Sequence, residues 1–212
     1  MPVERDAIPG PRTRERGSAI LDAWKRPESR AQNASAREFV YQTFAMTIGV
    51  IRILGVDPGL RTTGWGVIEA AGSRLSFVGC GSIETDPGFS LAERLAAIHR
   101  LLTGLIEREG PHEAAVEETF INRDPQSALK LGQARGVALA TLALTGLPVA
   151  EYAANLIKKT VVGVGHAEKR QVAMMVRMLL PASTASTPDA ADALAVAICH
   201  AQHRAARARG AA

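Results

Sequence analysis

The chain has 212 residues, 47% of them hydrophobic and 22% charged, which is enough for one domain with a full hydrophobic core. Its net charge of +4 favours an anionic partner such as nucleic acid, and two distant cysteines argue against a disulfide framework or a zinc site. No apolar run approaches the roughly 20 residues of a transmembrane helix, and the first residues lack the apolar stretch of a signal peptide. We therefore expect a cytoplasmic protein with no membrane association.

Residues 1–45 differ in composition from the rest of the sequence. They carry four prolines, mixed charges and little hydrophobic periodicity, which predicts a disordered N-terminal extension. The periodic pattern begins just after Met46, so Met46 is a candidate alternative translation start. One folded domain is expected over 46–206, followed by a basic tail over 207–212 that frays.

Hydrophobic periodicity and turn residues predict the order of elements within this domain. The expected elements are strands over 51–56, 63–69 and 74–84, a helix between Ser90 and Gly110, a strand over 114–118, a helix over 125–145, a strand over 149–153, and helices over 167–180 and 188–206. Because short turns join the first three strands, they predict an antiparallel meander. The whole order predicts a mixed α/β fold in which helices flank a five-stranded sheet on both faces.

Two acidic residues stand at the ends of predicted strands. Asp57 follows the apolar segment 51–56, and Pro58 and Gly59 stop that strand at once. Glu117 ends the fourth strand in the same way. If these strands are parallel neighbours, both carboxylates lie at one edge of the sheet, where ligands collect in α/β folds. Asp57 has a second interpretation, because Asp-Pro-Gly is by itself a good turn sequence.

Two further carboxylates, Asp189 and Asp192, open the last predicted helix and share one of its faces. Asp189 also fits an ordinary helix start, because an acidic side chain in the first turn is favoured by the helix dipole. Four converging carboxylates repel each other unless a cation neutralises them, and oxygen ligands without Cys or His suit Mg²⁺ or Mn²⁺. Two such ions about 3.5–4 Å apart can activate water and cleave a phosphodiester. The residue types therefore predict a nuclease.

Six segments of this sequence, in the same order, resemble the RuvC family. They are Gly-Val-Asp-Pro-Gly-Leu-Arg-Thr-Thr-Gly-Trp-Gly-Val-Ile from 55, Val-Glu-Glu-Thr-Phe from 116, Ser-Ala-Leu-Lys-Leu-Gly-Gln-Ala-Arg-Gly-Val from 127, Lys-Lys-Thr-Val-Val-Gly from 158, Ala-Glu-Lys from 167 and Asp-Ala-Ala-Asp-Ala-Leu-Ala from 189. The resemblance covers the chain from about residue 52 to about residue 200 and leaves the first 45 residues outside the family pattern.

The resemblance implies an RNase H-like fold and a homodimeric endonuclease that resolves four-way (Holliday) DNA junctions during recombination and DNA repair by nicking paired strands. It also implies the RuvA and RuvB branch-migration complex as partners. The catalytic and metal-binding residues that it implies are Asp57, Glu117, Asp189 and Asp192. With these residues we expect two Mg²⁺ ions per active site, with Mn²⁺ as the alternative.

A basic surface for DNA is expected in the second half of the chain, because residues 122–180 contain eight Lys or Arg and only three Asp or Glu. The predicted phosphate contacts are Lys130, Arg135, Lys158, Lys169 and Arg170, with Lys159 and Arg177 as further candidates. Each of them also fits a solvated helix face. Lys158 and Lys169 match basic positions of the family near its active site. Phe120 matches a family aromatic near the junction and is predicted to stack on a base, although packing in the core is the usual role of a phenylalanine.

Two other functions fit parts of the pattern. A strand followed by an acidic residue and a Gly/Thr turn also begins the actin-like or sugar-kinase type of ATP-binding domain, which normally requires a second such domain. An RNase H-like protein can also bind junctions without cutting them. ATP binding without DNA cleavage would indicate the first function, and junction binding without metal-dependent cleavage would indicate the second.

Overall fold

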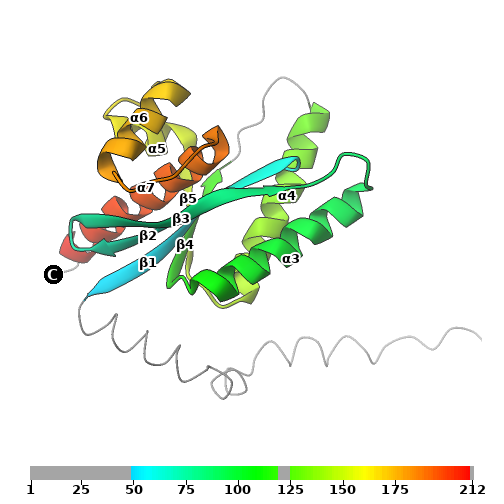
Figure 1. The fold of residues 1–212 in the computed structure, drawn as a ribbon, viewed down its shortest axis with the longest axis horizontal. Coiled ribbons are helices and arrows are strands. Elements are labelled where there is room, and N and C mark those ends of the chain that lie inside the picture. The colour runs from blue at the N-terminus through cyan, green and yellow to red at the C-terminus, as the bar shows by residue number, and fades with distance from the viewer. Residues whose placement is uncertain (1–48, 119–124, 211–212) are drawn as a thin grey trace, which may run out of the picture. The chain divides into compact units, whose positions relative to one another are not determined.

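The computed structural model describes residues 49–118 and 125–210, except for the side chains of 205–210. Its elements are β1 Val50–Asp57, β2 Thr62–Ala71, β3 Arg74–Glu84, α3 Leu91–Glu109, β4 Glu113–Glu118, α4 Pro125–Leu144, β5 Val149–Ala153, α5 Ala154–Val162, α6 Lys169–Leu179 and α7 Pro188–Gly210 (Figure 1). The expectations for residues 1–45 and for Phe120 lie outside the described residues. In the described part of the chain, no helix is both long and apolar enough to cross a membrane.

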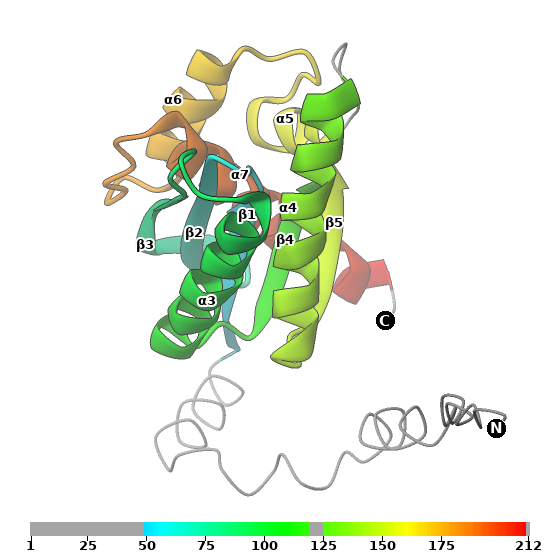
Figure 2. The same ribbon diagram turned by 90° about the vertical axis from the view of Figure 1, so that its right-hand side faces the viewer.

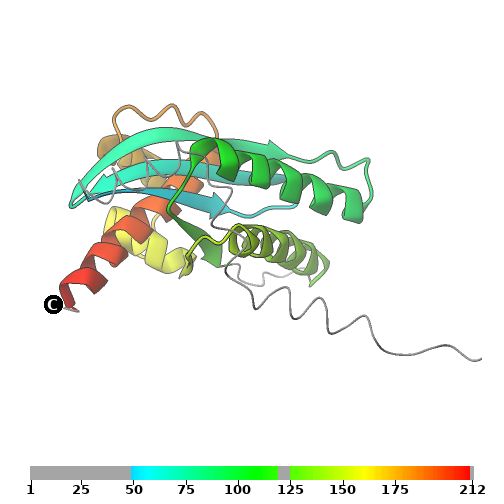
Figure 3. The same cartoon turned by 90° about the horizontal axis from the view of Figure 1, so that it is seen from below.

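The strands form one sheet in the order β3-β2-β1-β4-β5. β1, β2 and β3 pair antiparallel, which confirms the predicted meander. β4 pairs parallel with β1, and β5 pairs parallel with β4, so the sheet is mixed as predicted. A register shift between Val67 and Ile68 interrupts the ladder of the two long strands β2 and β3, and their curvature is visible from below (Figure 3).

Helices cover both faces of the sheet, as predicted. α5, α6 and α7 pack on one face around a core that includes Ile53. α3 and α4 pack against each other on the other face, above Leu54 and Val56 (Figure 2). Because successive side chains of a strand point to opposite faces, Ile53 and Leu54 belong to different cores. The same alternation directs Gly55 and Asp57 towards the face that α7 covers.

The helix predicted after Ser90 is α3, and both of its ends are capped as the sequence predicted. The backbone N–H of Glu93 donates to Ser90 Oγ at 3.4 Å, and the backbone N–H of Ser90 donates to Glu93 Oε2 at 2.9 Å. This reciprocal pair is a capping box. Gly110 ends the helix with a φ of 55°, a left-handed conformation that glycine adopts without strain.

α5, which follows β5 without a loop, was not predicted from the sequence. Its hydrophobic signal consists of Ile157 and Val161, four residues apart and both buried in the core beneath α7. Two apolar positions in nine residues are a weaker periodic pattern than those of the longer helices. The helix carries Lys158, one of the predicted DNA contacts.

α7 lies close to β1 because Gly55 has no side chain. A Cβ atom added to Gly55 would lie 2.1 Å from the backbone oxygen of Ala193. Gly64, which pairs with Asp57 across β1 and β2, approaches the backbone oxygen of Asp189 equally closely, at 2.1 Å from an added Cβ. These two glycines therefore allow the start of α7 to approach the end of β1.

We expect Gly55→Ala to lower the free energy of unfolding by about 2–3 kcal/mol, because the new methyl group would collide with the backbone of α7. Gly104→Ala is the matched control, since Gly104 lies on the exposed surface of α3 with no atom within 4 Å of an added Cβ. The control should gain roughly 1 kcal/mol from the higher helix propensity of alanine. Urea unfolding measures both changes. A Gly55 variant as stable as the wild type would mean that α7 moves away at no cost.

Candidate active site at the end of β1

Three of the four predicted carboxylates line one cavity at the ends of β1 and β4. The lining residues are Asp57, Glu117, Ala154, Ile157, Lys158, Lys169, Val172, Asp192 and Ala195. Val56 and Val116 are partners in the parallel pairing of β1 and β4, so Asp57 and Glu117 follow them side by side at the ends of the two strands. Asp192 reaches the cavity from the beginning of α7.

Asp189 stands three residues before Asp192, in the first turn of α7. Its backbone oxygen approaches Gly64, the residue opposite Asp57 in the sheet, and its charge acts on the carboxyl group of Asp57. The side chain of Thr187 begins the helix by accepting a hydrogen bond from the backbone N–H of Ala190 at 3.2 Å. Asp189 therefore occupies an ordinary helix start and also lies next to the acidic cavity.

A second Asp-Pro-Gly segment, at 86–88, provides a comparison for the turn interpretation of Asp57. The backbone N–H of Gly88 donates to Asp86 Oδ1 at 2.8 Å, which is the side-chain bond of an Asx turn. In the first segment, the backbone N–H of Gly59 donates instead to Thr63 Oγ1 at 3.3 Å. Thr63 thus accepts the hydrogen bond from the backbone of this turn, and the carboxylate of Asp57 lines the cavity.

Burial and mutual repulsion raise the pKa values of the carboxyl groups of Asp57 and Glu117 in the cavity. The pKa of Asp57 is raised from the usual 3.8 to about 8, first by burial and then by the charges of Glu117 and Asp192. Burial and the charge of Asp192 also raise the pKa of Glu117. Lys169 lowers both pKa values, but its positive charge does not cancel these effects. A bound cation would relieve this repulsion.

Lys169 forms an ion pair with one of these carboxylates. Its Nζ atom donates to Asp192 Oδ2 at 2.9 Å, and this hydrogen bond raises the pKa of Lys169. Over residues 49–118 and 125–210, no group of three or more His, Cys, Asp or Glu side chains is arranged to hold a metal ion. The cavity thus brings several carboxylates together, and a lysine balances part of their charge.

Metal-free protein should become less stable as the pH rises from about 4 to about 8. The pKa of Asp57 is about 8 in the folded protein and 3.8 when unperturbed. Between these values the folded state keeps a proton that the unfolded chain has lost, so each pH unit lowers the free energy of unfolding by at most about 1.4 kcal/mol. Thermal unfolding in EDTA across this range measures the effect, which Asp57→Asn should flatten. Stability that increases over the same range would contradict the prediction.

Glu118, the neighbour of Glu117, belongs to the other face of the sheet. Ala115 and Glu117 lie on the face that α7 covers, whereas Val116 packs into the core beneath α3 and α4. The alternation of a strand places Glu118 on the side of Val116. The cavity is accordingly lined by Glu117.

The predicted DNA contacts separate into two groups. Those near the cavity are Lys158, Lys169 and Arg170. Lys130 is exposed on α4, and Arg135 on the same helix forms an ion pair with Glu151 of β5. This pairing gives Arg135 a structural role within the protein, and its contact with DNA stays a prediction.

A groove between α6 and the start of α7 adjoins the cavity and shares Lys169 and Asp192 with it. The groove is lined by Lys169, Arg170, Ala173, Val176, Arg177, Ala185, Ser186, Thr187, Pro188, Ala191 and Asp192. Arg170 and Arg177 are exposed, and Ser186 and Thr187 line the same groove. The seven-residue spacing of the two arginines places them on one helix face, but only folding brings Ser186 and Thr187 into the groove with them.

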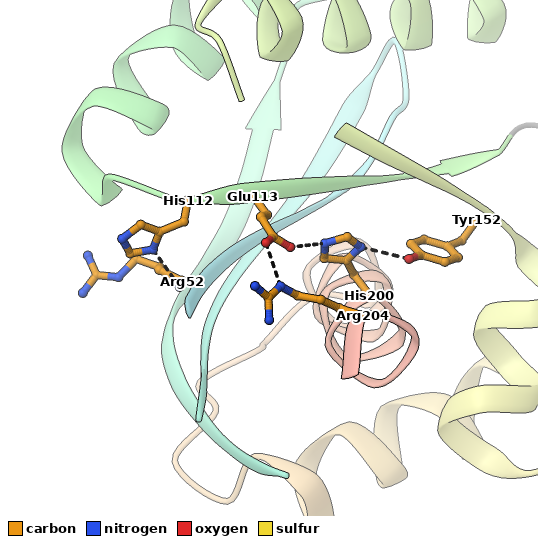
Figure 4. Close-up of polar contacts among 6 residues, drawn as sticks. All are labelled: Arg52, His112, Glu113, Tyr152, His200 and Arg204. Atoms are coloured by element: carbon orange, nitrogen blue, oxygen red, sulfur yellow. Dashed lines mark hydrogen bonds and ion pairs between the residues drawn. The ribbon is translucent and has the colours of Figure 1, made fainter. Parts of the chain in front are cut away.

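A second polar cluster lies at the other end of β4, around Glu113 (Figure 4). Arg204 Nε donates to Glu113 Oε1 at 2.6 Å, and His200 Nε2 lies 2.8 Å from Glu113 Oε2. His200 Nδ1 is also 2.9 Å from the hydroxyl oxygen of Tyr152 on β5. Burial alone would raise the pKa of Glu113, but the bonds from Arg204 and His200 outweigh it and lower the pKa. The cluster attaches the second half of α7 to the sheet, and we assign it a structural role.

A mixed five-stranded sheet with helices on both faces, and carboxylates at the ends of its adjacent central strands β1 and β4, defines the class of RNase H-like nucleases. The family model for the crossover junction endodeoxyribonuclease RuvC matches residues 53–200. The chain therefore belongs to the RuvC family. The RuvC of Methylocella silvestris is 71% identical over 163 residues, which cover 77% of this chain and 93% of that protein. The RuvC of Xanthobacter autotrophicus is 63% identical over 164 residues, covering 77% and 97%.

Solved structures agree with this assignment. The structure of Thermus thermophilus RuvC in complex with a Holliday junction substrate superposes with a TM-score of 0.69 at 34% sequence identity, covering 74% of this chain and 96% of that one. The yeast mitochondrial Holliday junction resolvase Ydc2 superposes with a TM-score of 0.54 at 13% identity, covering 74% and 83%, and supports the fold alone. The RNase H-like fold and the family resemblance that the sequence predicted are both confirmed.

Proposed function

We propose that this chain is a structure-selective endonuclease that resolves four-way DNA junctions by metal-dependent hydrolysis of phosphodiester bonds, in recombination and DNA repair. The observation that carries the proposal is the gathering of Asp57, Glu117 and Asp192 in one partly buried cavity, with Asp189 close by on α7. Membership of the RuvC family supports the reaction, and the likeness to an RuvC in complex with a Holliday junction supports the substrate.

The donor set fits magnesium or manganese, because hard divalent cations prefer carboxylate oxygens. We assign Asp57, Glu117, Asp189 and Asp192 as the residues that would hold two such ions per active site. The pKa of Asp57 is raised first by burial and then by the neighbouring carboxylates, whose negative charge these ions would neutralise. When bound, the metal would activate a water molecule and stabilise the leaving oxygen of the cleaved phosphodiester.

Basic side chains around the cavity would hold the DNA backbone. Lys158 and Lys169 line the cavity itself and would neutralise the phosphate that is cleaved. The groove between α6 and α7 would receive a neighbouring phosphate of the same strand, through Arg170 and Arg177. Contacts of this kind position the strand without reading its sequence.

We further propose that the enzyme acts as a homodimer. A four-way junction presents equivalent strands related by two-fold symmetry, and two protein copies related by a two-fold axis would offer one cavity to each of two such strands. This arrangement would produce the paired nicks that resolution requires. The RuvA and RuvB branch-migration complex is the partner that the family resemblance implies.

Incubation of the full chain with an end-labelled four-way junction tests the proposal. In Mg²⁺ or Mn²⁺ we expect two symmetric nicks, whereas in EDTA we expect junction binding without cleavage, because the carboxylates then lack the cation that activates water. A linear duplex of the same sequence is the matched control and should stay intact.

Two results would overturn the proposal. Junction binding without cleavage in either metal would indicate a binding protein with an RNase H-like fold. ATP binding in the absence of any DNA cleavage would indicate the actin-like alternative.

A further inference from the structure

In the proposed metal site, the ammonium group of Lys169 provides a positive charge next to the carboxylates. Its Nζ atom is 2.9 Å from Asp192 Oδ2, and both residues line the cavity together with Asp57 and Glu117. Among the residues that the structure describes, no three or more His, Cys, Asp or Glu side chains are arranged to hold a metal ion. The observed arrangement of the cavity therefore suits an internal ammonium group.

We infer that Lys169 is the counter-cation of the metal-free site and must leave Asp192 before this carboxylate can bind a divalent metal ion. The inference rests on the proposed function of the cavity. A magnesium ion lies about 2.0–2.1 Å from its oxygen ligands, so an ammonium group hydrogen-bonded to the same oxygen competes for the same space. Two cations against one carboxylate also repel each other.

Lys169 is the partner that can move. Its side chain is 72% exposed, whereas that of Asp192 is 17% exposed and projects from a helix packed into the core. The backbone of Lys169 stays in place, because Glu168 and Gln171 form a capping box at the start of α6, with the Glu168 N–H donating to Gln171 Oε1 at 2.8 Å. Four rotatable methylene groups let the ammonium swing away without disturbing this helix.

The groove between α6 and α7 offers a second position for the Lys169 ammonium group once it leaves Asp192. Lys169 lines the groove between α6 and α7 as well as the cavity, so its charge can turn towards a DNA phosphate in that groove. Metal binding would thus free Lys169 for DNA, and DNA binding would draw Lys169 away from the metal site. Such linkage is reciprocal, so each ligand raises the affinity for the other.

Titration of Mn²⁺ into the DNA-free full chain tests the inference, with free Mn²⁺ measured by electron paramagnetic resonance. Lys169→Met should raise the affinity for Mn²⁺ about tenfold, because the metal no longer breaks a hydrogen bond between charged groups. Lys158→Met is the matched control: Lys158 lines the same cavity, and its removal measures the effect of losing one nearby charge. We expect about twofold for this control.

Thermal stability gives an independent readout. In EDTA, Lys169→Met should lower the melting temperature more than Lys158→Met, because only the first variant removes the ion pair with Asp192. In saturating Mn²⁺ the wild type and the Lys169 variant should converge, since the metal has already displaced the lysine in the wild type.

An affinity for Mn²⁺ in Lys169→Met that is no higher than in Lys158→Met would overturn the inference and leave Lys169 as a DNA contact alone. Failure of the proposed function gives a different result. In that case Asp57→Asn would bind Mn²⁺ as tightly as the wild type, because the carboxylates would not be metal ligands.

Discussion

Asp57→Asn should reduce the rate of junction cleavage in Mg²⁺ about a thousandfold and leave junction binding intact. The amide keeps the size and polarity of the side chain but removes a charge that would hold the cation. Metal stabilisation of the transition state is worth several kcal/mol, and each 1.36 kcal/mol corresponds to a factor of ten in rate. Single-turnover cleavage and a gel-shift assay in EDTA measure the two quantities separately.

The same variant should be more stable than the wild type in EDTA at pH 8. Burial and neighbouring carboxylates disfavour the ionised form of Asp57, and the neutral amide avoids this repulsion. Asp86→Asn is the matched control, because Asp86 begins the other Asp-Pro-Gly segment and its Oδ1 accepts from the backbone N–H of Gly88. An asparagine can make the same bond, so cleavage and stability should both stay unchanged. Unfolding of the Asp57 variant would restore the turn interpretation.

Glu117→Gln should lower the cleavage rate about a hundredfold to a thousandfold, whereas Glu118→Gln should retain most of it. Glu117 lines the cavity, and its raised pKa results from burial and from the nearby charge of Asp192. Removing its negative charge weakens the hold on the cation without changing the size of the side chain. Parallel measurements of cleavage and junction binding on both variants compare adjacent residues of one strand.

The two glutamine variants are each other's control, because they differ only in the face of β4 that carries the change. Junction binding should survive in both. If Glu118→Gln were the inactive variant, the strand would have to carry an irregularity that rotates Glu118 towards Asp57. The regular pairing of Glu117 with Tyr152 and of Glu118 with Ala153 in β4 and β5 argues against such an irregularity.

Local sequence signals were enough for most of the fold. Alternating and helical periodicities predicted all five strands and the four helices α3, α4, α6 and α7, and Ser90 and Gly110 marked the ends of α3. Burial of apolar side chains imposes these periods on the sequence wherever an element is long enough. α5 was not predicted, because only Ile157 and Val161 of its nine residues are buried.

The sequence by itself also determined the family and the residue types of the candidate site. Six ordered motifs identified the RuvC family, and the family match over residues 53–200 confirmed it. The strand ends at Asp57 and Glu117 and the helix start at Asp189 were readable because turn and capping residues leave local signatures.

Only the tertiary structure decided how these side chains meet. Asp192 pairs with Lys169 across 23 positions of sequence, Ser186 and Thr187 line one groove with Arg170 and Arg177, and Gly55 lets α7 approach β1. Periodicity reports which face of an element is buried, but it carries no information on which distant side chain arrives there. Contacts between remote segments depend on sheet order and helix packing, and the balance of charge around Asp57 follows from those contacts.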